Sequence, residues 1–290
     1  MSVRVSSPTQ THPLRRLASR IGEISTLPQV AQRVIEIASD DHSGAHDLKQ
    51  ALESDVSLSA RVLRIVNSSA FGLRQRIANL QMAVTYLGFR QIRNLALTAC
   101  IAEIFRNSEQ IGSYRRDHLW RHSVSVGITA RMIAMRRKID QFEEIFLGGL
   151  LHDIGIVFAD QYDHPKFRKM VLSLRPGESL EQFERTHLGY THSELGELVG
   201  EKWNFPAMTR SAIRFHLDPG KAPAEFVRAV HCVALANYLI TIKGLPSVGM
   251  NLTPPPTESV TALGLARSDL EAILLDLDDE LSRNAALLGL

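Results

Sequence analysis

Hydrophobic residues recur every three to four positions along most of the chain, which is the spacing of one face of an α-helix. In the stretch from residue 27 to 41, Val30, Val34, Ile37 and Ala38 fall on one such face. No stretch alternates hydrophobic and polar residues over a useful strand length, so the sequence predicts an all-α, multi-helical fold. The same helical pattern extends over the segments 45–55, 57–72, 80–88, 89–105, 118–138, 141–155, 192–206, 207–216, 222–244 and 266–290.

The last of these segments has the clearest amphipathic pattern. Ser268 and Glu271 have the spacing of a capping box, which predicts a helix start there. We expect the apolar stripe to pack against the body of the protein, and a dimer contact is the alternative. The stripe consists of Leu270, Ile273, Leu274, Leu277 and Leu281.

Polar and turn-rich segments suggest how the chain is divided. Residues 106–117 are polar and resemble a connector, whereas residues 244–259 are rich in glycine and proline. We therefore predict four parts. They are a disordered or loosely ordered tail at 1–19, an N-terminal helical subdomain at 20–110, a helical bundle at 115–245, and a loop with a C-terminal amphipathic helix at 246–290.

Composition narrows the function class only slightly. The formal net charge of +2 comes without a basic stripe, which argues against a nucleic-acid partner. No apolar run approaches the ~18 residues of a membrane span, and the first twenty residues lack the apolar segment of a signal peptide. Cys100 and Cys232 lie far apart in apolar runs and are read as buried thiols in a reducing compartment. We expect a cytoplasmic protein with no membrane contact.

Histidine and carboxylate residues are spread over several helices of the predicted bundle. His122 lies early on one helix, His152 and Asp153 end the next, His192 begins a later one and His216 ends another. Adjacent residues of a helix point about 100° apart, so His152 and Asp153 can approach one cation from two sides. Such ligands, delivered from different helices, are typical of a metal centre in a helical scaffold.

These residues resemble the "H…HD…D" signature of the HD phosphohydrolase superfamily, and more closely its HDOD subgroup, the HD-related output domain of bacterial signalling proteins. The resemblance covers roughly residues 20–245. It implies that His122 matches the family's first histidine, and that His152 and Asp153 match its HD pair. The segments that carry it include "LPQVAQRVIEIASDD", "LESDVSLSARVLRIVNSSAFGL", "IANLQMAVTYLGFRQIRNLAL", "LWRHSVSVG", "GLLHDIG", "HSELGELVGEKWNFP" and "VHCVALANYL".

The chain departs from the superfamily where its last carboxylate is expected. The final bundle helix reads "ALANYL", so Asn237 replaces that aspartate. One missing charge at ~4 Å is worth about 4 kcal/mol of attraction at an effective dielectric of about 20, before desolvation is counted. A site with one carboxylate and several imidazoles favours Zn²⁺, Fe²⁺ or Ni²⁺ over harder ions. The chain also lacks marks of the HD-GYP phosphodiesterases, with Ile156 in place of their lysine and Phe215 in place of one histidine.

The resemblance implies a non-enzymatic regulatory and interaction module in bacterial signal transduction, whose partners are other signalling proteins and which requires no cofactor. One alternative is a metal-dependent phosphohydrolase or (cyclic di-)nucleotide phosphodiesterase. In that case His122, His152 and Asp153 hold Fe, Zn, Ni or Mn, Asn237 completes the site, and His192 or His216 contacts phosphate. A metal- or nucleotide-sensing pocket without turnover is a third hypothesis.

Each candidate residue also has a purely structural interpretation. His152 and Asp153 can cap a helix end, with Asp153 accepting from His122, and His192 and His216 can each cap a helix. The motif "RIVNSSAFGL", residues 64–73, can be a helix stop whose Asn and Ser side chains satisfy the backbone. A partner-binding role is the alternative for that motif.

Overall fold

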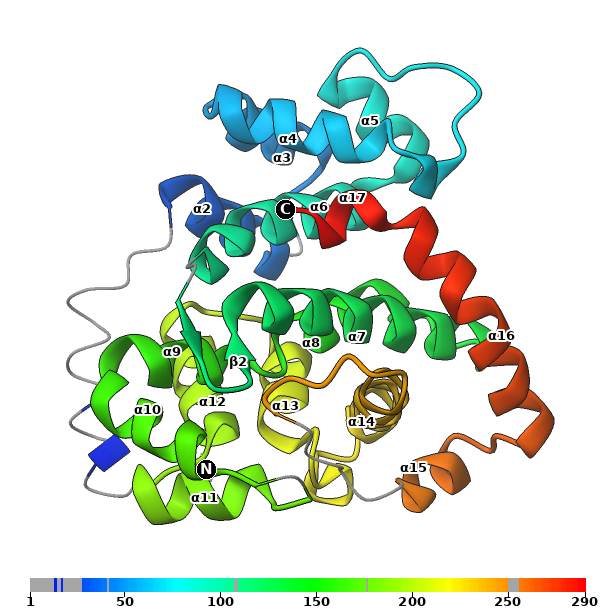
Figure 1. The fold of residues 1–290 in the computed structure, drawn as a ribbon. Helices are drawn as coiled ribbons and strands as arrows, with labels where there is room; N and C mark the ends of the chain where they lie inside the picture. Colours follow the sequence, from blue (N-terminus) through cyan, green and yellow to red (C-terminus); the bar gives the residue numbers. More distant parts are fainter. Residues whose placement is uncertain are drawn as a thin grey trace, which may run out of the picture.

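The structure is a computed structural model, and it describes residues 13–14, 17, 28–40, 42–106, 109–175, 177–249 and 256–290. Within this part of the chain the elements are helices, apart from one short antiparallel hairpin of β1 (Gln110–Ile111) and β2 (Tyr114–Arg115) (Figure 1). The all-α prediction is confirmed. The predicted tail at 1–19 lies almost wholly outside the described residues.

The N-terminal helices pack around α6, from which every residue between Ile92 and Ile101 is buried. Because α6 lies between the other N-terminal helices and α8, the polar side chains of Arg93 and Asn94 are buried there. The elements of this part are α2 (Gln29–Ser39), α3 (Ala45–Glu53), α4 (Val56–Val66), η1 (Ser69–Phe71), α5 (Leu80–Leu87), α6 (Phe89–Ile101) and η2 (Ala102–Phe105).

A second group of helices forms a bundle around α7, α8 and α14 (Figure 1). The helix α14 is apolar on most sides and is buried from Ala229 to Ala236, as its pattern predicts. The elements are α7 (Arg116–Arg136), α8 (Phe142–Leu151), α9 (Ile154–Tyr162), α10 (His164–Ser173), α11 (Leu180–His187), α12 (His192–Lys202), α13 (Ala207–Phe215), η3 (Pro219–Lys221) and α14 (Val227–Ile242).

The C-terminal helices run back over the bundle toward the N-terminal helices (Figure 1). They are α15 (Thr257–Ala262), α16 (Arg267–Arg283) and α17 (Ala285–Leu288). Ile273 and Leu277 of α16 are fully buried against α7 and α14, so the apolar stripe packs on the body as expected. The predicted capping box at Ser268 is wrong. The helix starts earlier, and the Asp269 carboxylate accepts from the backbone N–H of Ala266 at 2.8 Å.

Glycines bring the helices of the bundle unusually close at two crossings. A Cβ on Gly149 of α8 would lie 2.8 Å from the Cα of Gly127 on α7. A Cβ on Gly155 of α9 would overlap the carbonyl oxygen of His192 and lie 2.8 Å from the nitrogen of Gly196 on α12. Because real Cβ atoms do not approach backbone that closely, only glycine permits these crossings. They bring His122 toward His152 and His192 toward Asp153.

Within the described residues, no helix combines the length and the apolar character needed to cross a membrane. Cys100 and Cys232 are both buried free thiols, as the sequence predicts. The division between 20–110 and 115–245 stays a prediction.

We predict that Gly155→Ala destabilises the fold by about 3 kcal/mol, because the added methyl group collides with backbone that cannot swing away. Urea unfolding monitored by circular dichroism measures the loss. Gly44→Ala is the matched control, since a Cβ at Gly44 meets nothing within 4 Å and the residue has φ −134°. Wild-type stability of Gly155→Ala would show that the α9–α12 crossing is looser than the structure indicates.

Candidate metal centre

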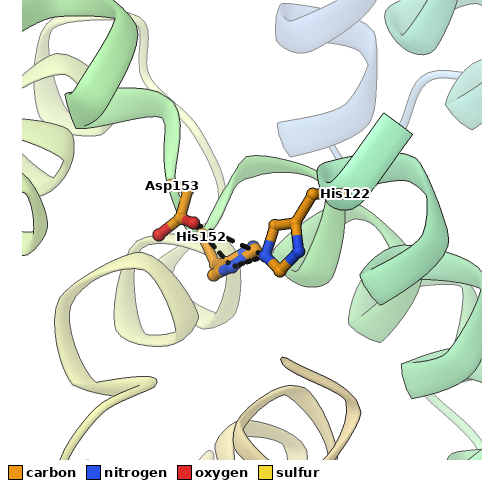
Figure 2. A group of neighbouring side chains, drawn as sticks. All are labelled: His122, His152 and Asp153. Atoms are coloured by element: carbon orange, nitrogen blue, oxygen red, sulfur yellow. Dashed lines mark hydrogen bonds and ion pairs between the residues drawn. The ribbon is translucent and has the colours of Figure 1, made fainter. Parts of the chain in front are cut away.

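His122 and His152 meet where α7 crosses α8, and both are fully buried (Figure 2). The Nδ1 of His122 lies 2.6 Å from the carbonyl oxygen of Leu245, and the Nδ1 of His152 lies 2.7 Å from that of Gly149. A carbonyl only accepts hydrogen bonds, so each Nδ1 carries the proton and donates it. In the neutral rings, each Nε2 then presents a lone pair, and these two Nε2 atoms lie 3.3 Å apart.

Asp153 follows directly in the chain, in the turn between α8 and α9. Its Oδ2 lies 3.2 Å from the Nε2 of His152 and 3.6 Å from the Nε2 of His122. The residue is 2% exposed, and its Oδ2 has no hydrogen-bond partner. A buried carboxylate oxygen without a donor is costly, because burial removes its water and nothing replaces it.

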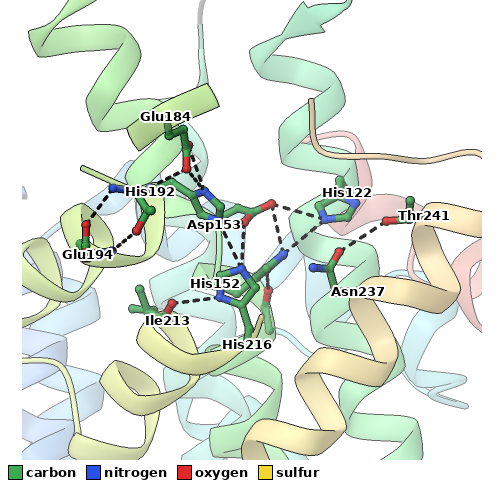
Figure 3. A network of polar contacts seen from close by, with 12 residues as sticks. His122, His152, Asp153, Glu184, His192, Glu194, Ile213, His216, Asn237 and Thr241 are labelled. Carbon is green, nitrogen blue, oxygen red and sulfur yellow. Dashed lines mark hydrogen bonds and ion pairs between the residues drawn. The ribbon is translucent and has the colours of Figure 1, made fainter. Parts of the chain in front are cut away.

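His192 and His216 reach the other oxygen of the same carboxylate (Figure 3). The Oδ1 of Asp153 lies 3.3 Å from the Nε2 of His192 and 3.5 Å from the Nε2 of His216. His216 ends α13 and donates its Nδ1–H to the carbonyl of Ile213 at 2.9 Å. The Nε2 atoms of His192 and His216 are also 3.3 Å apart. Asp153 therefore lies between two pairs of imidazoles.

Glu184 of α11 is a member of the site that the sequence analysis missed. Its carboxylate accepts the Nδ1–H of His192 at 2.8 Å and the backbone N–H of His192 at 3.0 Å. Glu184 is 1% exposed, so it orients the ring and fixes its tautomer in a place that water does not reach. One local sequence pattern lies near this residue. Thr191 and Glu194 form a capping box that makes His192 the first residue of α12.

Asn237 of α14 faces the same centre from the side of His122 (Figure 3). It is 7% exposed, and its Oδ1 lies 3.5 Å from the hydroxyl of Thr241. The amide thus lies where the resemblance expects the last ligand, but it contributes no negative charge.

Burial and charge act in opposite directions on the titration of these groups. Burial lowers the pKa of His122 and of His216 to about 4, so both rings are neutral at pH 7. Burial would also lower the pKa of His192, but the Glu184 carboxylate outweighs it and raises that pKa to about 9. Burial would raise the pKa of Asp153, yet the His152 imidazole holds it well below its usual value.

These observations fit a divalent metal. Two sets of ligand atoms each lie within 4.8 Å of one another, His122 with His152 and Asp153, and Asp153 with His192 and His216. The Nε2 lone pairs of His122 and His152 face one another beside the Oδ2 of Asp153, which has no donor, and a cation bound there would satisfy all three atoms. Since every anchored Nδ1 fixes its ring, the free Nε2 atoms are held ready as ligands. Imidazole and carboxylate ligands suit Zn²⁺, Fe²⁺, Ni²⁺ or Mn²⁺.

A cavity of about 510 Å³ leads to this centre. Asp153, His192, His216 and Asn237 form its inner wall, and residues of α11, α14 and α15 form its outer wall. A separate helix-capping role is the structural alternative for His192 and for His216, but both line the same cavity as Asp153.

A family model for the HDOD domain matches residues 24–219, which is more than half of the chain. The chain belongs to the HDOD domain family. Among solved structures, an HDOD domain protein of unknown function from Geobacter sulfurreducens superimposes with a TM-score of 0.78 at 25% identity, covering 95% of this chain and 96% of that one.

Further proteins resemble this chain in fold or in sequence. A Marinobacter aquaeolei VT8 protein named for signal transduction gives a TM-score of 0.76 at 24% identity, over 96% of this chain and 64% of that one. A Shewanella amazonensis SB2B protein named as a phosphohydrolase gives 0.75 at 20%, over 97% and 98%. These two likenesses show a shared fold. An uncharacterized Treponema pallidum (strain Nichols) protein is 25% identical over 237 residues, which is 80% of this HDOD chain but only 45% of that protein.

We predict that Glu184→Gln weakens divalent metal binding by about 10-fold or more, because His192 loses the charge that orients it and makes it a stronger base. Titration of metal-free protein with Zn²⁺ or Mn²⁺ against a competing chelator measures the affinity. Glu53→Gln is the control, since the exposed Glu53 lies on α3 and does not line the cavity. Equal affinities for the two variants would count against a role for Glu184 in the centre.

Proposed function

We propose that this HDOD protein is a regulatory module that binds a divalent metal at the His–Asp centre as a sensed or structural ligand, acts through protein partners, and does not hydrolyse phosphate esters. The observation that carries the proposal is the charge of the cavity wall. Among the described lining residues there are five carboxylates and no lysine or arginine: Asp153, Glu178, Glu181, Asp218 and Glu258.

A wall of this charge is unsuited to a phosphate ester. Enzymes that act on phosphoryl groups hold them with Arg, Lys or metal, aimed at oxygens that are negative from the start. Asp218 pairs with Lys221, but Glu178, Glu181 and Glu258 are in no ion pair with any described residue. These three carboxylates repel an anionic substrate and attract cations toward the centre.

The centre is connected to the N-terminal helices through α8. His152 and Asp153 follow the C-terminal end of α8, and Glu143 and Glu144 lie in its first turn. Asn94 of α6 donates to the Glu143 carbonyl at 2.6 Å and to its carboxylate at 3.1 Å.

The neighbouring Arg93, whose side chain is 6% exposed, lies 3.3 Å from Glu144. A partly buried ion pair and a buried amide hold the two helices in one register, because a shift of either helix leaves these groups without partners. A change in the position of α8 on metal binding therefore reaches α6, which supports a regulatory role.

A metal-dependent phosphohydrolase is the second candidate. Two ligand sets that share one carboxylate, next to an open cavity, favour it, because a paired centre can orient a phosphoryl group and activate water. In that case this chain's own residues hold the metal through His122, His152, His192, His216 and Asp153. Asn237 leaves that set one negative charge short.

The turnover assay separates the two candidates. Metal-free protein is loaded with Zn²⁺, Fe²⁺, Ni²⁺ or Mn²⁺, and bound metal is quantified alongside hydrolysis of bis(p-nitrophenyl) phosphate and cyclic dinucleotides. We expect stoichiometric metal, thermal stabilisation by mass action, and no hydrolysis above the metal-only background. Hydrolysis that Asp153→Ala abolishes and Asp278→Ala retains would establish the enzyme instead. Asp278 is a matched control because its side chain is 70% exposed on α16.

We also predict that Asn237→Asp raises the affinity for Mn²⁺ by about 10-fold or more. A new charge at ~4 Å gains about 4 kcal/mol at an effective dielectric of about 20, and desolvation of the buried carboxylate offsets part of this gain. Electron paramagnetic resonance titration of free Mn²⁺ measures the affinity. Asn79→Asp is the control, since Asn79 is the N-cap of α5, where aspartate serves equally well. Unchanged Mn²⁺ affinity in Asn237→Asp would place position 237 outside the coordination sphere.

A further inference from the structure

The motif at residues 64–73 is not used by the metal centre. It lies where α4 ends, in the part of the fold formed by α3, α4 and α5, away from α13 and α14 (Figure 1). There the end of α4 and the loop from 73 to 78 enclose a groove of about 1040 Å³. Within the described residues it is a larger hollow than the cavity at the metal centre.

Asn67 fixes the shape of this groove. Its Nδ2 donates to the carbonyl of Ile77 at 2.9 Å and to that of Leu63 at 2.8 Å, and its Oδ1 accepts from the N–H of Ile77 at 2.8 Å. The Asn67 side chain therefore bonds both backbone polar groups of Ile77 and holds this part of the loop against the end of α4. These hydrogen bonds agree with the helix-stop interpretation of the motif. They also keep the groove open on the surface.

The groove is positively charged. Arg64 and Arg76 line it and Arg74 lies in the same loop; all three are exposed, and none is in an ion pair with a described residue. No acidic side chain is among the described residues that line it. Ser68 also lines the groove.

The floor of the groove is apolar. Leu63 and Leu73 are half-buried there, and the exposed face of α4 continues the apolar surface through Ala60 to Val56, which is 81% exposed. Exposed apolar surface beside unpaired arginines is unusual for a surface that only meets water, and it is typical of a surface that binds a protein.

We propose that this groove binds an acidic amphipathic segment of a partner protein, with apolar side chains on Leu63 and Leu73 and carboxylates against Arg64 and Arg76. A free phosphate uses the arginines but leaves the apolar floor uncovered. A nucleic acid needs a longer basic stripe than three arginines supply. Carboxylates suit arginine because its planar guanidinium donates two parallel N–H bonds to the two carboxylate oxygens.

The inference rests on the proposed function only in that the chain acts through a protein partner, and the metal centre is not part of the groove. Metal binding is therefore measured on the same samples. If the protein binds metal but no acidic peptide, the groove proposal fails. If it binds acidic peptides but no metal, the proposed function of the metal centre fails.

The test is a selection from a displayed library of random 16-residue peptides. Full-length protein is the bait, and the double variant Arg64→Glu/Arg76→Glu is used for counter-selection. We expect enriched peptides to carry several carboxylates interspersed with Leu or Phe. Their affinity is expected to fall about 10-fold in the double variant and to weaken with added salt, because the contacts are between exposed charges. Fluorescence anisotropy of the synthetic peptides measures both effects.

The matched control is Arg121→Glu/Arg228→Glu, which reverses two exposed arginines on α7 and α14. This control is expected to bind the peptides like wild type. Four outcomes would overturn the proposal: enriched peptides without carboxylates, affinity unchanged in Arg64→Glu/Arg76→Glu, displacement of the peptides by inorganic phosphate or oligonucleotide at equimolar concentration, or self-association of the chain through these arginines in sedimentation velocity. Unchanged thermal unfolding of both double variants establishes that the changes are local.

Discussion

The site depends on one buried carboxylate that is shared among four imidazoles. Asp153 is 2% exposed, and both of its oxygens face Nε2 atoms and not water. Burial of a charge is tolerated only when opposite charge or donors replace its hydration. Here most of those Nε2 atoms carry no proton, because the protein has placed the protons on Nδ1. On the side of Oδ2, which has no donor, a cation among the rings would supply the missing opposite charge.

The rest of the bundle holds that arrangement in place. Carbonyls of Leu245, Gly149 and Ile213 fix three of the rings, and Glu184 fixes the fourth. Close helix crossings at glycines bring the rings within reach of one carboxylate. The inner and outer parts of the cavity therefore differ in what they attract. Under the proposed function, the inner centre attracts metal and the outer carboxylates of the cavity repel phosphate, so metal binding does not entail hydrolysis.

Much of the fold and part of the site could be predicted from the sequence. Helical periodicity places the helices, because an amphipathic helix needs only local spacing to be recognised. His122, His152 and Asp153 follow from the HD pattern. Glu184 could not be found this way, since it reaches His192 only after Gly189, with φ 80°, reverses the chain between α11 and α12. The convergence of His216 on Asp153 likewise depends on helix packing, which no local pattern records. The cavity's charge depends on residues far apart in the sequence, from Asp153 to Glu258, and it becomes visible only once they are assembled.

The placement of protons on the histidine rings tests this account most directly. Two-bond ¹H–¹⁵N correlation spectra of metal-free protein distinguish the two neutral tautomers, and single His→Gln variants assign the signals. The account predicts the Nδ1–H tautomer for His122, His152 and His216, with a large shift of their Nε2 resonances when stoichiometric Zn²⁺ is added. Protons on Nε2 in these rings, or Nε2 resonances that saturating Zn²⁺ leaves unmoved, would contradict it.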